Sequence, residues 1–357
     1  MKAQLLALCL VPLVVVAFNR QHEHGRRSHR LLIRGTEAKC QRICTYRVGD
    51  VKKQFPLKNL DASMCSHLIL SSADIELTGE IKLSNQLTDV IEEYKKWDEV
   101  KKPVLILSVG ANTSEKIWRR VIQSSFVRHQ LVRRLVQIYN SLDVDGLSID
   151  WIQGEVSNRD AFAKLFNELR RQEKFPEFAV LTAAITDEST TKDGYDITVM
   201  NSTANFLIIE GSRLQKHEQI VTKGVKQQEP KRTVESLAME WEAYGIPKKK
   251  LIIGYSVATP AKLEDEDICA TPSTPDASSE QPKQNRGIGV GVRAFAVGSI
   301  SPESAPVDSR RAMRQKTQWA SMNQFGGIAL RGIENDRAQC SENPFPVLKT
   351  IVETQKC

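Results

Sequence analysis

Two carboxylates and a hydroxyl lie close together in residues 145–152, which read D-G-L-S-I-D-W-I. We predict a β-strand here, and because side chains alternate along a strand, we expect its polar positions to point at one face. Asp145 and Asp150 can orient or polarise a bound group, and Ser148 is a weaker polar group. Ile152 is a hydrocarbon that cannot donate a proton, so the stretch lacks an acid at its last position.

The segments around this stretch predict an α/β fold. From about Ala38 onward, short apolar runs alternate with amphipathic segments, which is the pattern of repeated strand–helix units and a parallel sheet. Residues 157–173, for example, carry an apolar stripe at helical spacing after Ser157, a predicted N-cap. We expect eight strands, at 42–46, 67–72, 104–109, 146–150, 178–184, 206–210, 251–255 and 327–330.

Eight strands with intervening helices favour a closed (β/α)8 TIM barrel over residues 38–357. The alternative is a doubly wound open sheet, which would be expected to offer a glycine-rich phosphate loop after an early strand, and the sequence contains none. Residues 262–311 form a reduced or irregular insertion between strands 7 and 8. Because this insertion is rich in Pro, Ser and charge, we expect a long loop over the upper face of the barrel, with a small hairpin at 287–297.

The first 37 residues are expected to lie outside the barrel. Residues 1–17 are apolar after Lys2 and short for a membrane span, so we interpret them as a signal peptide cleaved after Ala17. The protein is then secreted and extracellular, with no stable membrane insertion. Residues 18–37 form a basic arm that we predict to be disordered. Its arginines also leave an uncleaved signal anchor or an organelle transit peptide open.

The net charge of +7 comes largely from this N-terminal region. Residues 1–37 hold six Lys or Arg and two acids, so the remaining 320 residues carry about +3. We therefore expect no nucleic-acid partner for the folded body. The arm is either a solvated linker or a segment that binds an anionic polymer.

The chain resembles glycoside hydrolase family 18, the chitinases and chitinase-like proteins. Its most specific element is D-G-L-S-I-D-W at 145–151. The supporting pieces follow in order: R-I-C-T-Y at 42–46, C-S-H-L-I-L at 65–70, S-V-G at 108–110, L-T-A-A at 181–184, Y-D-I at 195–197, L-I-I-G-Y at 251–255 and G-G-I-A-L at 326–330. The resemblance implies a (β/α)8 barrel. In active members a glutamic acid protonates the leaving oxygen, and a neighbouring Asp polarises the acetamido group of the substrate.

This chain departs from the family motif, which reads D-G-x-D-x-D-x-E. Ser148 replaces an Asp and Ile152 replaces the catalytic Glu, whereas Asp150 matches the assisting Asp. Because the acid must give up a proton in the transition state, a hydrocarbon cannot take its place. The resemblance therefore implies a degenerate site with no catalytic residues and no hydrolysis.

Other sugar-binding positions of the family have changed as well. Arg331 corresponds to the family's tryptophan at the floor of the sugar site. Residues 210–213 (E-G-S-R) replace the family's M-T-Y-D. The residues expected at the barrel mouth form either a residual groove or an ion cluster that plugs it: Asp150, Trp151, Glu210, Arg213 and Arg331.

The cysteines and sequons agree with a secreted glycoprotein. Six cysteines remain once Cys9 leaves with the signal peptide, and an even number suits an oxidising compartment. The family resemblance implies a disulfide between Cys44 and Cys65. The expected barrel suggests two further pairs on its upper and lower faces, Cys269–Cys340 and Cys40–Cys357.

The sequons at Asn112 and Asn201 predict N-linked glycans. Asn112 is expected near the barrel mouth, after the third strand, and Asn201 nearer the lower face. The sequence shows no metal-ligand spacing, so we expect neither a metal nor a cofactor.

We therefore expect a secreted chitinase-like pseudoenzyme that acts by binding. In one version the outer surface or the basic arm contacts an extracellular protein or an anionic glycan. In a second version the mouth remains a lectin site for chitin oligosaccharides or another glycan. The third alternative is an active glycosidase with relocated acids, of which Glu210 is the candidate.

Overall fold

The computed structural model describes residues 41–49, 56–151, 156–186, 192–210, 233–257, 310–336 and 345–355. Within these ranges the strands form a nine-stranded sheet. They are β1 (Gln41–Arg47), β2 (His67–Ile75), β3 (Ile81–Leu83), β4 (Val104–Val109), β5 (Gly146–Ile149), β6 (Val180–Thr186), β7 (Phe206–Glu210), β8 (Leu251–Ser256) and β9 (Gly327–Arg331).

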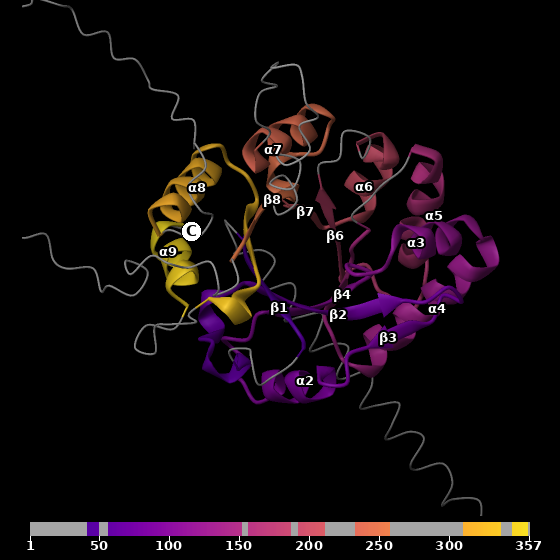
Figure 1. Ribbon diagram of the computed structural model, residues 1–357, viewed down its shortest axis with the longest axis horizontal. Coiled ribbons are helices and arrows are strands. Elements are labelled where there is room, and N and C mark those ends of the chain that lie inside the picture. The colour runs from indigo at the N-terminus through magenta and orange to yellow at the C-terminus, as the bar shows by residue number, and fades with distance from the viewer. Residues whose placement is uncertain are drawn as a thin grey trace, which may run out of the picture.

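Eight of these strands close into a parallel barrel. They follow the order β1-β9-β8-β7-β6-β5-β4-β2, and β1 also pairs with β2 to complete the ring. Figure 1 shows the helices arranged around the outside of the strands. The prediction of a (β/α)8 barrel is confirmed, and each of the eight expected strands overlaps a barrel strand.

The short strand β3 was not expected from the sequence. The second strand of the barrel continues beyond its predicted end to Ile75, and its last three residues pair antiparallel with β3. The register of β2 against β4 shifts between Ser71 and Ala73, which marks a β-bulge. The bulge lets the end of β2 leave the barrel and form a hairpin on its rim.

Eight α-helices are described outside the barrel: α2 (Leu87–Lys95), α3 (Glu115–Gln123), α4 (Ser125–Ser141), α5 (Arg159–Arg170), α6 (Ile197–Thr203), α7 (Val234–Ala243), α8 (Arg310–Met322) and α9 (Pro346–Thr354). The expected N-cap of the fourth of these helices, α5, was wrong by one residue. Residues Val156–Asn158 form a 3-10 turn, so α5 begins after Asn158 instead of Ser157. The Asn158 side chain bonds Gln123 of α3 and does not cap α5.

The interior of the barrel is filled by side chains from alternate strand positions. These form one cluster of buried residues: Ile43, Ile69, Val104, Ile106, Val180, Phe206, Ile208, Ile252 and Ala329. Gly146 of β5 lies at the same level, and a Cβ there would come within 2.4 Å of the Val180 carbonyl oxygen. Glycine is therefore required where β5 meets β6.

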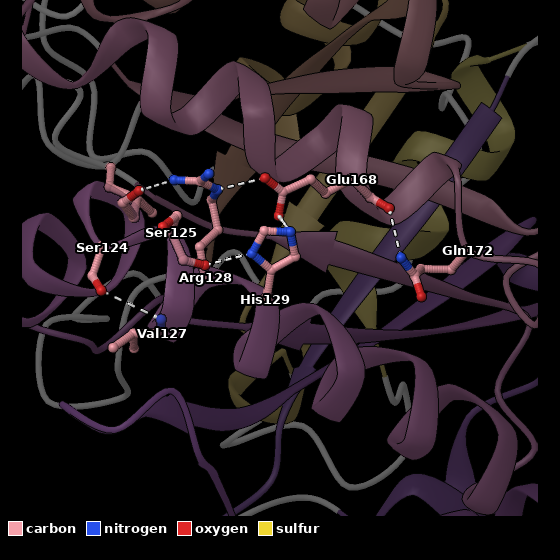
Figure 2. A network of polar contacts seen from close by, with 8 residues as sticks. Ser124, Ser125, Val127, Arg128, His129, Glu168 and Gln172 are labelled. Atoms are coloured by element: carbon pink, nitrogen blue, oxygen red, sulfur yellow. Dashed lines mark hydrogen bonds and ion pairs between the residues drawn. The ribbon is translucent and has the colours of Figure 1, made fainter.

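A polar network joins α4 and α5 (Figure 2). The buried Arg128 donates Nε–H to Glu168 Oε1 at 2.8 Å and Nη1–H to the Ile122 carbonyl at 2.6 Å. On the other side of the carboxylate, Nε2 of the exposed His129 lies 3.8 Å from Glu168 Oε2. Since a buried guanidinium needs such acceptors, the network fixes the two helices to each other.

One expected disulfide lies within the described residues. Cys44 of β1 is bonded to Cys65, which precedes β2, with a Cα–Cα distance of 5.9 Å. The pairs Cys269–Cys340 and Cys40–Cys357 lie outside the described residues, as do residues 1–40 and all of the expected insertion at 262–311 except its last two residues, which begin α8. Of the helices described, none is long and apolar enough to cross a membrane.

Candidate functional site at the carboxyl end of the barrel

Asp150 follows β5 and lies inside the carboxyl end of the barrel, with 3% of its surface exposed. Its Oδ1 accepts hydrogen bonds from the Ser148 hydroxyl at 2.5 Å and from the Ala184 amide at 3.1 Å. Its Oδ2 accepts one from the Ser108 hydroxyl of β4. Both oxygens of the carboxylate are therefore engaged by the protein.

Asp145 lies at the opposite end of the same strand. Its Oδ2 accepts a hydrogen bond from the Leu105 amide at 2.9 Å, and its own amide donates to the Leu105 carbonyl at 2.7 Å. The expectation that Asp145 shares a face with Ser148 and Asp150 is therefore wrong. Asp145 is three residues before Ser148, and a spacing of three places two side chains on opposite faces of a strand.

Glu210 and Arg331 form an ion pair at the carboxyl end of the barrel. Nη1 of Arg331, from β9, lies 3.2 Å from Oε2 of Glu210, from β7. The Glu210 side chain is 6% exposed and that of Arg331 is 22% exposed. Glu210 raises the pKa of Arg331 above its ordinary value, and Asp150 and Glu334 contribute in the same direction. The guanidinium therefore lies in the field of three carboxylates.

Glu334 was not identified from the sequence. It lies in a 3-10 turn, Ile333–Asn335, directly after β9, and its Oε2 accepts a hydrogen bond from the Arg47 amide at 3.0 Å. Burial raises the pKa of Glu334, and burial together with Glu334 raises the pKa of Tyr46 to about 12. The available signal was its position: an acid three residues beyond the end of a barrel strand must lie near the mouth.

Trp151 lies outside the barrel, contrary to the expectation that it lines the mouth. It is 1% exposed, its Nε1–H donates to Glu115 Oε2 at 3.0 Å, and its carbonyl accepts from the Tyr195 hydroxyl at 2.5 Å. Its ring packs against Phe162, with ring centroids 4.8 Å apart. The reason is again the alternation of strand side chains, which directs Trp151 away from the interior that Asp150 faces.

The other expected site residues are only partly described. Asn112 is exposed in the turn after β4, near the mouth, and Asn201 is half-buried on α6. Ile152 and Arg213 lie outside the described residues. The described residues contain no group of three His, Cys, Asp or Glu side chains that could hold a metal ion.

The three carboxylates described at the mouth all have hydrogen-bond partners within the protein. Asp150 accepts hydrogen bonds from three protein donors, Glu210 is paired with Arg331, and Glu334 is bonded to the backbone of β1. Buried charges require such partners. This arrangement stabilises the end of the barrel.

The chain combines a closed (β/α)8 barrel with an acidic motif at the fourth strand of that barrel. The family model described as "Glycosyl hydrolases family 18" matches residues 42–336. The chain therefore belongs to glycosyl hydrolases family 18.

Relatives of known sequence include proteins named as chitinase-like proteins. A chitinase-like protein of Caenorhabditis elegans is 27% identical over 92% of this chain, and the match spans 35% of that protein. The chain thus spans about a third of the length of this relative. Human chitinase-3-like protein 2 is 22% identical, over 90% of this chain and 94% of that protein.

Solved structures share the fold at low sequence identity. YKL-39 solved in the presence of chitooligosaccharides has a TM-score of 0.66 and 18% identity, covering 89% of this chain and 100% of that one. The Group IV chitinase of Ostrinia furnacalis has a TM-score of 0.64 and 17% identity, covering 88% and 99%. At these identities the likeness concerns the fold alone.

Proposed function

We propose that this protein is a secreted, non-catalytic member of family 18 that acts by binding. The observation that carries the proposal is the isoleucine at position 152, where the family motif has its proton-donating Glu. Substrate-assisted hydrolysis needs that proton at the leaving oxygen, and an aliphatic side chain cannot provide it.

The state of Asp150 supports the same conclusion. In the family mechanism this Asp polarises the acetamido group of the substrate, which requires an available carboxylate oxygen. Here hydrogen bonds from Ser148 and Ala184 occupy one oxygen, and Ser108 donates to the other. A sugar would have to displace or share these protein donors.

The pair between Arg331 and Glu210 favours a vestigial mouth over a sugar-binding one. At the position of Arg331 the family has a tryptophan whose ring stacks on the sugar. A guanidinium held at 3.2 Å by a buried carboxylate offers a charged, solvated group in place of that apolar surface. We therefore infer that the partner, an extracellular protein or an anionic glycan, contacts the outside of the barrel or the basic arm.

The alternative is a lectin that binds chitin oligosaccharides through the mouth. Human YKL-39, with a TM-score of 0.63 to this chain, is described as a pseudo-chitinase with retained chitooligosaccharide binding properties. A pseudo-chitinase of this fold can therefore retain sugar binding. The third possibility, an active glycosidase that uses Glu210, conflicts with the engagement of Glu210 by Arg331.

Titration of the full-length secreted protein with chitotetraose separates the two binding versions. We expect no heat of binding at micromolar protein with the wild type. Micromolar affinity that is lost in Asp150→Asn and kept in Asp145→Asn would instead establish the lectin. The Asp145 variant is a matched control, because it makes the same chemical change at the other end of the same strand. Release of fluorophore from a fluorogenic chitobioside would overturn the non-catalytic assignment.

Secretion and modification are proposed on sequence grounds. We propose cleavage of residues 1–17, glycans at Asn112 and Asn201, and the disulfides Cys40–Cys357 and Cys269–Cys340. The exposed position of Asn112 supports a glycan near the mouth. N-terminal sequencing of protein from culture medium, peptide-N-glycosidase treatment and non-reducing peptide mapping test these three points in turn.

A further inference from the structure

The positive charge of the folded body is concentrated on two consecutive helices, α3 and α4. Residues 115–141 contain six Lys or Arg and one acid, a net charge of +5, whereas residues 38–357 as a whole carry about +3. The rest of the body is therefore slightly negative. Such a local excess of one sign attracts partners of the opposite charge.

On α3 the charges lie opposite the packed face. Trp118, Val121 and Ile122 are buried against the rest of the molecule, and three cations project from the exposed side: Lys116, Arg119 and Arg120. Since residues three and four apart share one side of a helix, Lys116 and Arg120 lie one above the other and Arg119 is beside them.

On α4 the outward side continues this surface. Six side chains of α4 are buried, and Phe126 and Arg133, seven residues apart, lie on the opposite side. Phe126 is 68% exposed. The other two arginines of α4 have carboxylate partners on neighbouring elements, Arg128 with Glu168 of α5 and Arg134 with Glu80 of the β2–β3 turn.

The carboxyl end of α3 meets the amino end of α4. Ser124 is the C-cap of α3 and the N-cap of α4, and its hydroxyl accepts a hydrogen bond from the Val127 amide. Six residues separate Arg120 from Phe126, so their Cα atoms are at most about 20 Å apart. We call the surface formed by Lys116, Arg119, Arg120, Phe126 and Arg133 the basic face.

We propose that the basic face binds a linear sulfated polysaccharide. Guanidinium groups form bidentate hydrogen bonds with sulfate and carboxylate oxygens, and three of the four cations are arginines. The exposed ring of Phe126 provides an apolar surface on which a sugar ring can pack. The choice of a sulfated glycan among polyanions rests on the proposed secretion.

An anionic membrane fits this surface less well. A helix that binds a lipid surface places its apolar side in the membrane interface. The apolar sides of α3 and α4 are buried in the protein, and Phe126 is the one large hydrophobic side chain exposed on these two helices. The basic face therefore offers charge with little apolar area for insertion.

Fluorescence anisotropy with a labelled heparin octasaccharide tests the proposal on the full-length secreted protein. Three variants each remove four positive charges, so that they share one net charge. The first changes the basic face (K116Q/R119Q/R120Q/R133Q), the second changes exposed lysines elsewhere (K82Q/K96Q/K174Q/K249Q) and the third changes the arm (R20Q/R26Q/R27Q/R30Q). Thermal unfolding of each variant checks that the fold is retained.

We expect the basic-face variant to raise Kd at least about tenfold and to make binding less dependent on salt, while the other two change Kd by less than about threefold. F126A should weaken binding less than the basic-face variant. Equal losses in all three variants, or a loss confined to the arm variant, would overturn the proposal. Binding to desulfated octasaccharide with unchanged affinity, or to phosphatidylserine vesicles in preference to heparin, would overturn it as well.

Discussion

Nη1 of Arg331 lies 3.2 Å from Oε2 of Glu210, although 121 residues separate them in the chain. The two residues belong to β9 and β7, which both pair with β8, so their ion pair spans one strand at the carboxyl end of the barrel. Glu210 is nearly buried and Arg331 is partly exposed. Removing either side chain would leave the other charge without its partner, and this would lower the stability of the protein.

Glu210→Gln should lower the stability of the protein. It leaves the Arg331 guanidinium without a carboxylate partner at 3.2 Å, and we expect a loss of about 2–3 kcal/mol in the free energy of unfolding, less than for a fully buried pair. Urea denaturation measures this loss. In a double-mutant cycle, Arg331→Met should recover part of it in the Glu210→Gln background. Unchanged stability, combined with abolition of a measurable hydrolysis, would assign Glu210 a catalytic role instead.

Ile152→Glu should not restore hydrolysis by itself. The change returns a carboxylic acid to the motif, but Asp150 remains engaged by Ser108, Ser148 and the Ala184 amide, and Arg331 remains paired near the mouth. We expect fluorophore release from a chitobioside substrate to stay at the background rate. Turnover by this single variant would mean that position 152 alone separates the protein from activity.

Asp145→Ala should destabilise the barrel and leave partner binding unchanged. The buried carboxylate accepts a hydrogen bond from the Leu105 amide at 2.9 Å, and leaving that amide unsatisfied costs about 1–3 kcal/mol. Since Asp145 lies at the amino end of β5, affinity for any ligand of the mouth or the basic face should not change. An altered affinity in folded Asp145→Ala would contradict this structural role.

Glu334→Gln should change how stability depends on pH. Burial raises the folded-state pKa of Glu334 above its unfolded value near 4.5, so between these two pKa values the folded state holds more protons. Stability contributed by this group is therefore present below pH 4.5 and lost as pH rises through the folded pKa. Gln keeps an acceptor for the Arg47 amide and does not titrate.

Urea denaturation from pH 4 to pH 8 measures this difference. As pH rises, the free energy of unfolding of Glu334→Gln should increase relative to that of the wild type. The exposed Glu173→Gln serves as the control for the same chemical change at the surface. The opposite trend, a fall in the stability of Glu334→Gln relative to the wild type with rising pH, would contradict this. It would mean that the neighbouring arginines favour the charged form of Glu334 more strongly than burial disfavours it.

The fold could be predicted because its signals are local. Each barrel strand is a short apolar run between amphipathic segments, and eight such runs suffice to infer the barrel. The extra pairing of β2 with β3 depends on a bulge after Ser71, for which the sequence of β2 gives no distinct signal. The one-residue error at the start of α5 came from a 3-10 turn that the N-cap pattern does not reveal.

The site could be predicted only in part, for a similar reason. Glu210 and Arg331 were expected to meet because both end barrel strands, and strand ends gather at one mouth. Asp145 and Trp151 differ from the prediction because each is an odd number of residues from Asp150, and such a spacing places a side chain on the opposite face of a strand. Glu334 was overlooked because it lies in a turn beyond a strand, where no repeating pattern marks it.

The two faces of β5 contact separate sets of residues. Trp151 packs among Trp118, Phe162 and Tyr195 on the outside, while the Ser148 hydroxyl donates a hydrogen bond to Asp150 inside. A substitution on the inner side meets none of the aromatic contacts that hold the strand in place. Ser148 and Asp150, at the carboxyl end of this strand, are therefore positions where new chemistry could be introduced without altering the aromatic packing outside.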